Sequence, residues 1–194
     1  QTMLAILRLL KTFVRAARLP TLHPHETCIT HWRVLPGDID ALGHMNNARY
    51  PVLMDIARVD FLLRCGLFRG VVRRRWAVPV GSVHLRFRRS LKPFERFELH
   101  TRLLHWDERW FYFRHDFYRL ADRSQPVCTA HVSTLFLGRQ GAVGTDVVVP
   151  ALAGRPLAPP SGAEEVRHVF GQAARQRETN PHTVMENPAV HAPP

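Results

Sequence analysis

The sequence predicts an α+β fold in which an antiparallel sheet covers one long central helix. Residues 27–34 read as a strand, and apolar residues recur every three or four positions from about 47 to 65. From residue 83 onward, apolar and polar residues alternate instead. No other segment of this region is long enough to bury the helix, so one face of the sheet must cover it. With 194 residues and 45% apolar content, the chain can form such a core in one domain.

The long helix is predicted from about Asn47 to Cys65, with Gly66 closing it. A turn over Pro36–Asp38 separates it from the first strand, and Asn46 or Asn47 is a natural N-cap. Its apolar positions form a single stripe: Tyr50, Leu53, Met54, Ala57 and Phe61.

Four strands are predicted after this helix, and apolar and polar residues alternate in the first two of them. Asp107–Glu108 predicts a hairpin turn between the second and third of them. Another turn, at residues 121–124, precedes the last strand. The four predicted strands are residues 83–88, 97–103, 110–120 and 127–137.

Composition divides the chain into three parts. Residues 1–25 are predicted to form an amphipathic helix and a linker, residues 26–138 the central domain, and residues 139–194 a C-terminal extension. Eight of the 15 prolines fall after residue 149, which predicts an extended, proline-rich tail. A capping-box pattern opens one short helix within this tail, near residues 161–177.

The predicted N-terminal helix, residues 3–18, is amphipathic and basic. Its four cations are spaced by three, four and three residues, which places them on one face, and the opposite face is apolar. Two readings stay open. Either the apolar face docks on the rest of the domain or on a second subunit, or the helix rests on an anionic membrane. The cations are Arg8, Lys11, Arg15 and Arg18, and the apolar residues are Leu7, Leu10, Val14 and Ala17.

The chain is strongly basic, with 27 basic and 16 acidic residues and a net charge of +11. This charge favours an acidic partner: nucleic acid, anionic lipid or a phosphate-bearing small molecule. Nucleic acid is not expected, because the sequence carries no helix-turn-helix, zinc-finger or basic-aromatic RNA-binding signature. Three widely spaced cysteines indicate a reducing compartment such as the cytoplasm. No metal site, cofactor motif or transmembrane helix is predicted.

The loop that precedes the long helix, Gly37–Tyr50, carries the most informative chemistry. Asp38, Asp40 and His44 lie within seven residues of one another, next to a helix N-terminus whose N–H groups favour developing negative charge. A carboxylate placed there can act as a nucleophile or activate water. The same residues also suit a turn in which aspartates and asparagines only cap the backbone, and spacing alone does not separate the two readings.

The string DIDALGHMNNARY, residues 38–50, resembles the DxDxxGHxNNxxY signature of hotdog-fold thioesterases of the 4-hydroxybenzoyl-CoA thioesterase type. Residues 90–95 and 100–112 are similar to the branch of that family that contains thioesterase superfamily member six. The resemblance covers about residues 26–138. It implies a hotdog fold, in which the sheet wraps around the long helix and two subunits join their sheets edge to edge.

The resemblance also implies roles for the loop residues. Asp40 matches the motif aspartate that acts as nucleophile or general base on the thioester carbonyl. His44 matches a motif histidine that helps to orient substrate or water. Asn47 matches the start of the central helix, where backbone amides polarise the carbonyl, and Asn46 is expected to contact substrate beside it. Asp38 is expected to support the turn.

Substrate binding is expected from basic and apolar residues nearby. Arg86 and Arg88 follow the strand alternation onto a polar face, where they would pair with phosphates of coenzyme A or acyl-carrier protein. A solvated basic face is the alternative. Tyr50 and Met54 are candidates for the acyl pocket, and the same positions equally suit a packed core.

The predicted function is therefore hydrolysis of an acyl thioester, carried by coenzyme A or acyl-carrier protein, to a free acid and a thiol. The expected assembly is a homodimer or a dimer of dimers that needs no cofactor. The alternative is a non-catalytic protein that binds acyl thioesters or lipids on the same fold. It stays open because Leu42 stands where the similar plant acyl-carrier-protein thioesterases have an asparagine.

Overall fold

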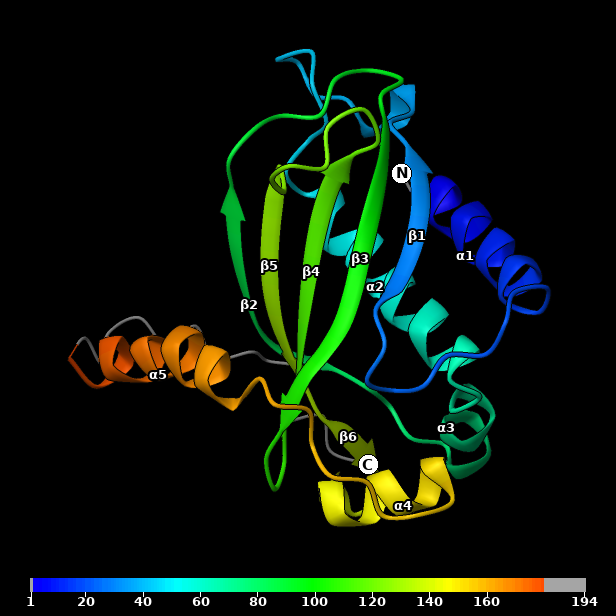
Figure 1. The fold of residues 1–194 in the computed structure, drawn as a ribbon, viewed down its shortest axis with the longest axis vertical. Coiled ribbons are helices and arrows are strands. Elements are labelled where there is room, and N and C mark those ends of the chain that lie inside the picture. Colours follow the sequence, from blue (N-terminus) through cyan, green and yellow to red (C-terminus); the bar gives the residue numbers. More distant parts are fainter. Residues whose placement is uncertain (1, 180–194) are drawn as a thin grey trace.

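A computed structural model describes residues 2–179, and Figure 1 shows its fold. Five antiparallel strands form one sheet in the order β1-β3-β4-β5-β2. The last predicted strand ends early, because the chain leaves the sheet after Thr134 and forms a separate two-stranded hairpin. The strands are β1 (Cys28–Arg33), β2 (Val80–Phe87), β3 (Arg96–Trp106), β4 (Phe111–Arg119), β5 (Cys128–Thr134), β6 (Phe136–Gly138) and β7 (Gly141–Val143).

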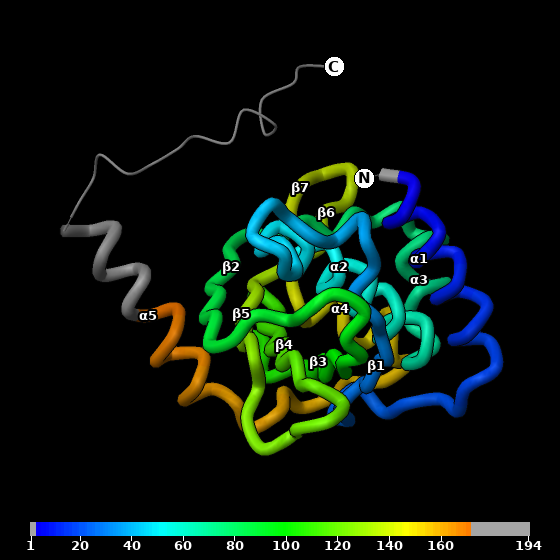
Figure 2. The backbone as a smooth tube through the Cα atoms, turned by 90° about the horizontal axis from the view of Figure 1, so that it is seen from above, coloured from blue at the N-terminus to red at the C-terminus, as the bar shows by residue number. Residues whose placement is uncertain are grey.

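The central helix α2 (Arg49–Arg64) lies in the curve of this sheet, as Figure 2 shows from above. Its predicted apolar stripe is buried against the strands. The Tyr50 ring meets that of Phe117 with centroids 4.8 Å apart, and Phe61 meets Phe113 at 5.5 Å. Burying each such side chain contributes about 1.5–3 kcal/mol. The sheet that covers one long helix is therefore confirmed.

Two further helices depart from the sequence prediction, α3 (Phe68–Arg74) and α4 (Thr145–Ala153). Helix α4 replaces part of the predicted extended tail, although Pro150 lies inside it and lacks the N–H that a helix interior uses. Packing explains the difference. Val148 is 1% exposed, and Leu152 packs against the same cluster as Phe61. Tertiary burial of an apolar face thus outweighs local propensity here.

Helix α5 (Ala163–Thr179) spans the residues for which a short helix is predicted in the extension. It covers one end of the outer face of the sheet, where Val166 packs with Leu104 and Tyr112. Phe170 adds a ring contact to Tyr112 at 4.9 Å. The end of the predicted extension, residues 180–194, lies outside the described residues.

The N-terminal helix α1 (Thr2–Ala16) docks on the domain through its basic face. The Arg8 guanidinium makes two bonds to the buried Asp38 carboxylate, at 2.8 and 2.6 Å, and Arg15 reaches Asp60 on α2 at 2.9 Å. The reading in which the apolar face docks on the rest of the domain is therefore wrong, because two buried carboxylates draw the cations inward. The apolar side chains instead face outward, and each is more than half exposed: Met3, Ile6, Leu7, Leu10 and Val14.

Within residues 2–179, no helix is both long and apolar enough to cross a bilayer.

Candidate active site

The loop before α2 forms a small, tightly bonded hairpin. The Asp40 N–H donates to the His44 carbonyl at 3.1 Å, and the Gly43 N–H donates to the Asp40 carbonyl at 3.1 Å. Gly43 has φ +77°, a left-handed conformation that favours glycine. The Met45 N–H donates to the Leu91 carbonyl at 2.9 Å and ties the hairpin to the strand connection beside it. These bonds fix the backbone on both sides of Asp40.

Asp38 supports this loop from beneath. Its side chain is 1% exposed, and its Oδ2 accepts bonds from Arg8 and from the Leu35 N–H at 2.9 Å. Arg49, at the start of α2, places its Nε 3.8 Å from Oδ1. With both oxygens held by cations and backbone, Asp38 has a structural position and no path to a substrate.

Asp40 has the opposite environment, because its side chain is 23% exposed. Oδ1 accepts the Leu42 N–H at 2.9 Å, and Oδ2 meets no donor within the described part of the chain. The His44 Nδ1 lies 3.8 Å from Oδ1, which is too long for a hydrogen bond, and this nitrogen is buried without a partner. Asp40 therefore presents one free carboxylate oxygen beside an imidazole that a small shift would bring into contact.

The start of α2 offers fewer amides than the sequence predicts. Ala48, and neither asparagine, occupies the N-cap position, and it makes no side-chain capping bond. The Asn46 side chain instead accepts the Ala48 N–H at 2.8 Å, and its carbonyl accepts the Arg49 N–H at 2.9 Å. Asn46 is thus engaged in its own turn. The Asn47 N–H, in an exposed position, donates to no acceptor among residues 2–179 and is the amide left for a ligand.

The other predicted substrate contacts fall into two groups. Tyr50 and Met54 are each 1% exposed and belong to the main core cluster, so they do not line a pocket in this chain. Arg86 and Arg88 lie exposed toward the end of β2, and Arg88 donates to the Thr129 hydroxyl at 2.9 Å. This end of β2 adjoins the first turn of α2, because Phe87 contacts Tyr50 with ring centroids 5.0 Å apart.

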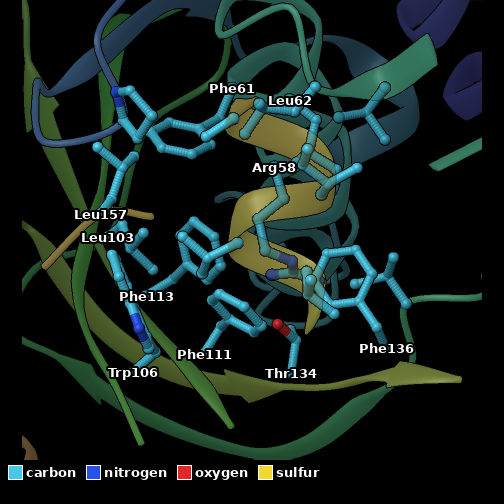
Figure 3. Close-up of a pocket in the computed structure, with 18 of the residues that line it drawn as sticks. Arg58, Phe61, Leu62, Leu103, Trp106, Phe111, Phe113, Thr134, Phe136 and Leu157 are labelled. Atoms are coloured by element: carbon cyan, nitrogen blue, oxygen red, sulfur yellow. The ribbon is translucent and has the colours of Figure 1, made fainter. Parts of the chain in front are cut away.

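A cavity of about 380 Å³ lies farther along α2, between the second half of the helix, the sheet and α4. Figure 3 shows its mostly aromatic and aliphatic walls, into which Arg58 and Thr134 project, and Asp55 is a third polar side chain among its lining residues. Asp40 is not among the residues that line it. The apolar wall includes Phe61, Leu62, Leu103, Phe111, Phe113 and Leu157.

A buried polar chain leads from this cavity into the core. The Arg58 Nη1 lies 3.4 Å from the His115 Nε2, and the His115 Nδ1 lies 3.0 Å from the Thr101 hydroxyl. Complete burial, together with the charges of Arg58 and His131, holds the pKa of His115 well below its usual value. His115 is therefore neutral, with Nε2 accepting from Arg58 and Nδ1–H donating to Thr101. Burial likewise lowers the pKa of the Arg58 guanidinium.

Neither Arg58 nor His115 is among the site residues predicted from the sequence, although the sequence pattern contains a signal for each. Arg58 falls midway between Met54 and Leu62, at four-residue steps along one face of the helix. His115 takes an inward position of β4, where the alternation calls for an apolar residue, and it is fully buried. A polar side chain at a position that the pattern assigns to the core is the feature to look for.

Comparison with known proteins identifies the family of this chain. A family model described as "Thioesterase-like superfamily" matches residues 34–173 of the chain. The chain belongs to this superfamily. A solved structure of similar shape is the 4-hydroxybenzoyl-CoA thioesterase of a Pseudomonas strain, with a TM-score of 0.57 at 22% sequence identity. That alignment covers 64% of this chain and 98% of the other. The hotdog fold implied by the sequence resemblance is thereby confirmed.

Two similar relatives of this thioesterase-like chain carry the name Protein THEM6. The one from Xenopus laevis is 38% identical over 137 residues, which is 70% of this chain and 63% of the relative. The one from Danio rerio is 34% identical over 142 residues, which is 72% of this chain and 67% of the relative. The chain thus spans about two thirds of these relatives. The branch that the sequence resembles is confirmed.

Proposed function

We propose that this thioesterase-like chain hydrolyses acyl thioesters, with Asp40 as nucleophile or general base. The observation that carries the proposal is the pairing of a half-buried carboxylate, free at Oδ2, with the unused Asn47 amide at the start of α2. A thioester carbonyl between them would meet a nucleophile on one side and a hydrogen-bond donor on the other. Superfamily membership supports the reaction class.

Asp40 could act in thioester hydrolysis by two routes. As nucleophile, Asp40 attacks the carbonyl carbon, the carbon–sulfur bond breaks and the thiolate leaves. Water then hydrolyses the resulting mixed anhydride, which releases the acid and restores the Asp40 carboxylate. As general base, Asp40 takes a proton from the water that attacks the carbonyl, and the thiolate leaves. In both routes the Asn47 N–H stabilises the developing oxyanion, and His44 orients the carboxylate or the water.

The thiol carrier fits two exposed arginines, one near the end of β2 and one directly after it. Arg86 and Arg88 lie near the first turn of α2 and carry charge into solvent on the side of the loop. Phosphates of coenzyme A or of acyl-carrier protein are the anions that such arginines would bind.

The decisive variant is Asp40→Asn, which keeps shape and hydrogen bonding but removes the carboxylate. Hydrolysis of acyl-CoA substrates should fall by about 10²- to 10⁴-fold while their binding persists. Asp146→Asn, an exposed aspartate on α4, is the matched control and should keep full activity. A single turnover in ¹⁸O-water, followed by mass spectrometry of the loop peptide, would label Asp40 only by the nucleophile route.

The competing function is a non-catalytic binder of acyl thioesters or lipids. This function would be supported if the parent chain hydrolysed no acyl-CoA of any chain length but bound acyl-CoA in a titration. Hydrolysis by Asp40→Asn at the rate of the parent would instead show that the site is assigned to the wrong residue.

We also propose a homodimer that joins two sheets at β2. This strand is one of the two edges of the sheet, and an unpaired edge can pair with a second strand. Val80, Val83 and Phe87 are each 40% exposed along it. Light scattering should give twice the chain mass of 22.3 kDa, or four times for a dimer of dimers. A mass of one chain at assay concentration would contradict the proposal.

We propose, finally, that α1 rests on an anionic lipid surface. Its apolar stripe faces outward, with Lys11 and Arg18 exposed at the border of the stripe. The stripe continues toward α3, where Phe13 contacts Phe68 with ring centroids 5.2 Å apart, and α3 adds exposed Arg69. An apolar strip bordered by cations suits anionic headgroups.

A further inference from the structure

The cavity beside the second half of α2 contains polar groups that the proposed thioester chemistry does not use. Its walls are apolar except for a few side chains, and Figure 3 shows Arg58 and Thr134 pointing into the same space. A charged group inside an apolar cavity is costly unless it is paired, so each of its hydrogen-bond donors has to be accounted for.

The Arg58 guanidinium is held from two sides. Asp55, whose side chain is 64% exposed, pairs with it from the solvent side, and His115 accepts a bond from the core side. These contacts use two of the five N–H groups of a guanidinium. Three donors remain without a partner among the described residues, on a side chain that the neighbouring groups hold in place.

The Thr134 hydroxyl is a second, independent donor in the same cavity. Thr134 is the last residue of β5 and is 0% exposed, and its Oγ1 has no hydrogen-bond partner in the described part of the chain. Buried hydroxyls are normally bonded, so an orphaned one that lines a cavity indicates that an acceptor is expected there.

We propose that this cavity binds a free carboxylic acid with an apolar body, such as a fatty acid. The carboxylate would accept bonds from Arg58 and Thr134, and its chain would lie along Phe61, Leu103 and Leu157. A planar guanidinium matches a carboxylate in a two-bond geometry. The volume of about 380 Å³ lies in the range of small-molecule sites. The site is separate from Asp40 and so goes beyond the proposed hydrolysis.

Calorimetric titration of the whole chain with sodium decanoate tests the proposal, with decan-1-ol as the uncharged probe of equal length. Decanoate should bind with one site per chain and more tightly than the alcohol. Asp40→Asn should bind decanoate as the parent does. Failure of the hydrolysis proposal is therefore distinguishable from failure of this one.

Three variants locate the site. Arg58→Met should weaken decanoate binding by roughly 10- to 100-fold, as expected for loss of a charge-assisted pair. Thr134→Val should weaken it by roughly 3- to 10-fold while its melting temperature stays at or above that of the parent, because an unpaired buried hydroxyl is removed. Arg73→Met removes an exposed charge on α3 and should leave decanoate binding unchanged.

Two results would overturn the proposal. One is decanoate binding that neither Arg58→Met nor Thr134→Val changes, which would place the acid elsewhere, for example on the α1 stripe. The other is equal affinity for decanoate and decan-1-ol in the parent. If Arg58→Met fails to fold, the Thr134→Val result decides, because that variant is expected to be stable.

Discussion

The two ends of α2 face opposite kinds of environment. At its N-terminal end lies a polar loop in which Asp40 meets solvent and Asp38 is held by Arg8. Beside its second half lies a mostly apolar cavity with Arg58 as its cation. Arg58 is nine residues beyond Arg49, which corresponds to roughly 14 Å along a helix axis.

This separation suggests a division of labour. The N-terminal end carries the partly exposed Asp40 carboxylate, whereas the second half borders the mostly apolar cavity. The two proposals therefore assign bond cleavage and recognition of an apolar acid to different ends of α2, and we expect each to be perturbed without the other. The predictions below test that independence, from the largest expected effect to the smallest.

Arg8→Met should have the largest effect and should act on the polar end. It removes the cation that makes two bonds to buried Asp38, and breaking such a buried pair costs about 3–5 kcal/mol of unfolding free energy. Urea unfolding measures the loss, and decanoate affinity of the folded fraction should be unchanged. Arg18→Met, an exposed cation, is the control. A loss below about 1 kcal/mol for Arg8→Met would show that the loop does not depend on α1.

The Arg8–Asp38 ion pair is a feature that the sequence alone does not predict. Periodicity predicts that α1 has a basic and an apolar face, and it equally predicts the central helix and the alternating strands. It does not predict which face of α1 is buried, because the choice depends on Asp38 and Asp60, which lie 30 and 45 residues from their arginine partners. The loop motif predicts candidate site residues by type, whereas the Asn46 bond that occupies an amide depends on backbone geometry.

Leu10→Glu tests how the two ends of α2 are oriented relative to a membrane. If the outward stripe of α1 rests on lipid, the polar end of α2 lies just behind the membrane contact. Sedimentation with phosphatidylglycerol-containing vesicles should fall by roughly tenfold or more, since a buried leucine contributes about 1.5–3 kcal/mol. Val147→Glu, at an exposed apolar position on α4, is the matched control.

Two outcomes would count against this contact. Equal sedimentation of Leu10→Glu and the parent would remove lipid as the partner of the stripe. A change in molecular mass for Leu10→Glu, measured by light scattering, would assign the stripe to a second subunit instead.

His115→Gln should have the smallest effect, on the cavity end, and only in acid. The pKa of His115 is lowered in the fold, chiefly by burial and then by Arg58 and His131. Below pH ~6.5 the His115 imidazole therefore binds a proton in the unfolded chain but not in the folded chain. Stability is retained above that pH and falls below it, by at most about 1.4 kcal/mol per pH unit.

The glutamine variant should lack this part of the pH dependence. Urea unfolding at pH 7.5 and 5.5 provides the measurement for both proteins. If the parent and His115→Gln lose the same stability between these two values, the imidazole does not control the acid response.

The salt bridges beneath α1 also set the minimal folding unit. The superfamily match begins at residue 34, yet Arg8 and Arg15 come from before it. Truncation to the matched region would leave Asp60, which is 0% exposed, without its cation, and Asp38 with only Arg49 at 3.8 Å. Such carboxylates would have to take up protons or admit water. We therefore expect the autonomously folding domain to be longer than the region that the family model matches.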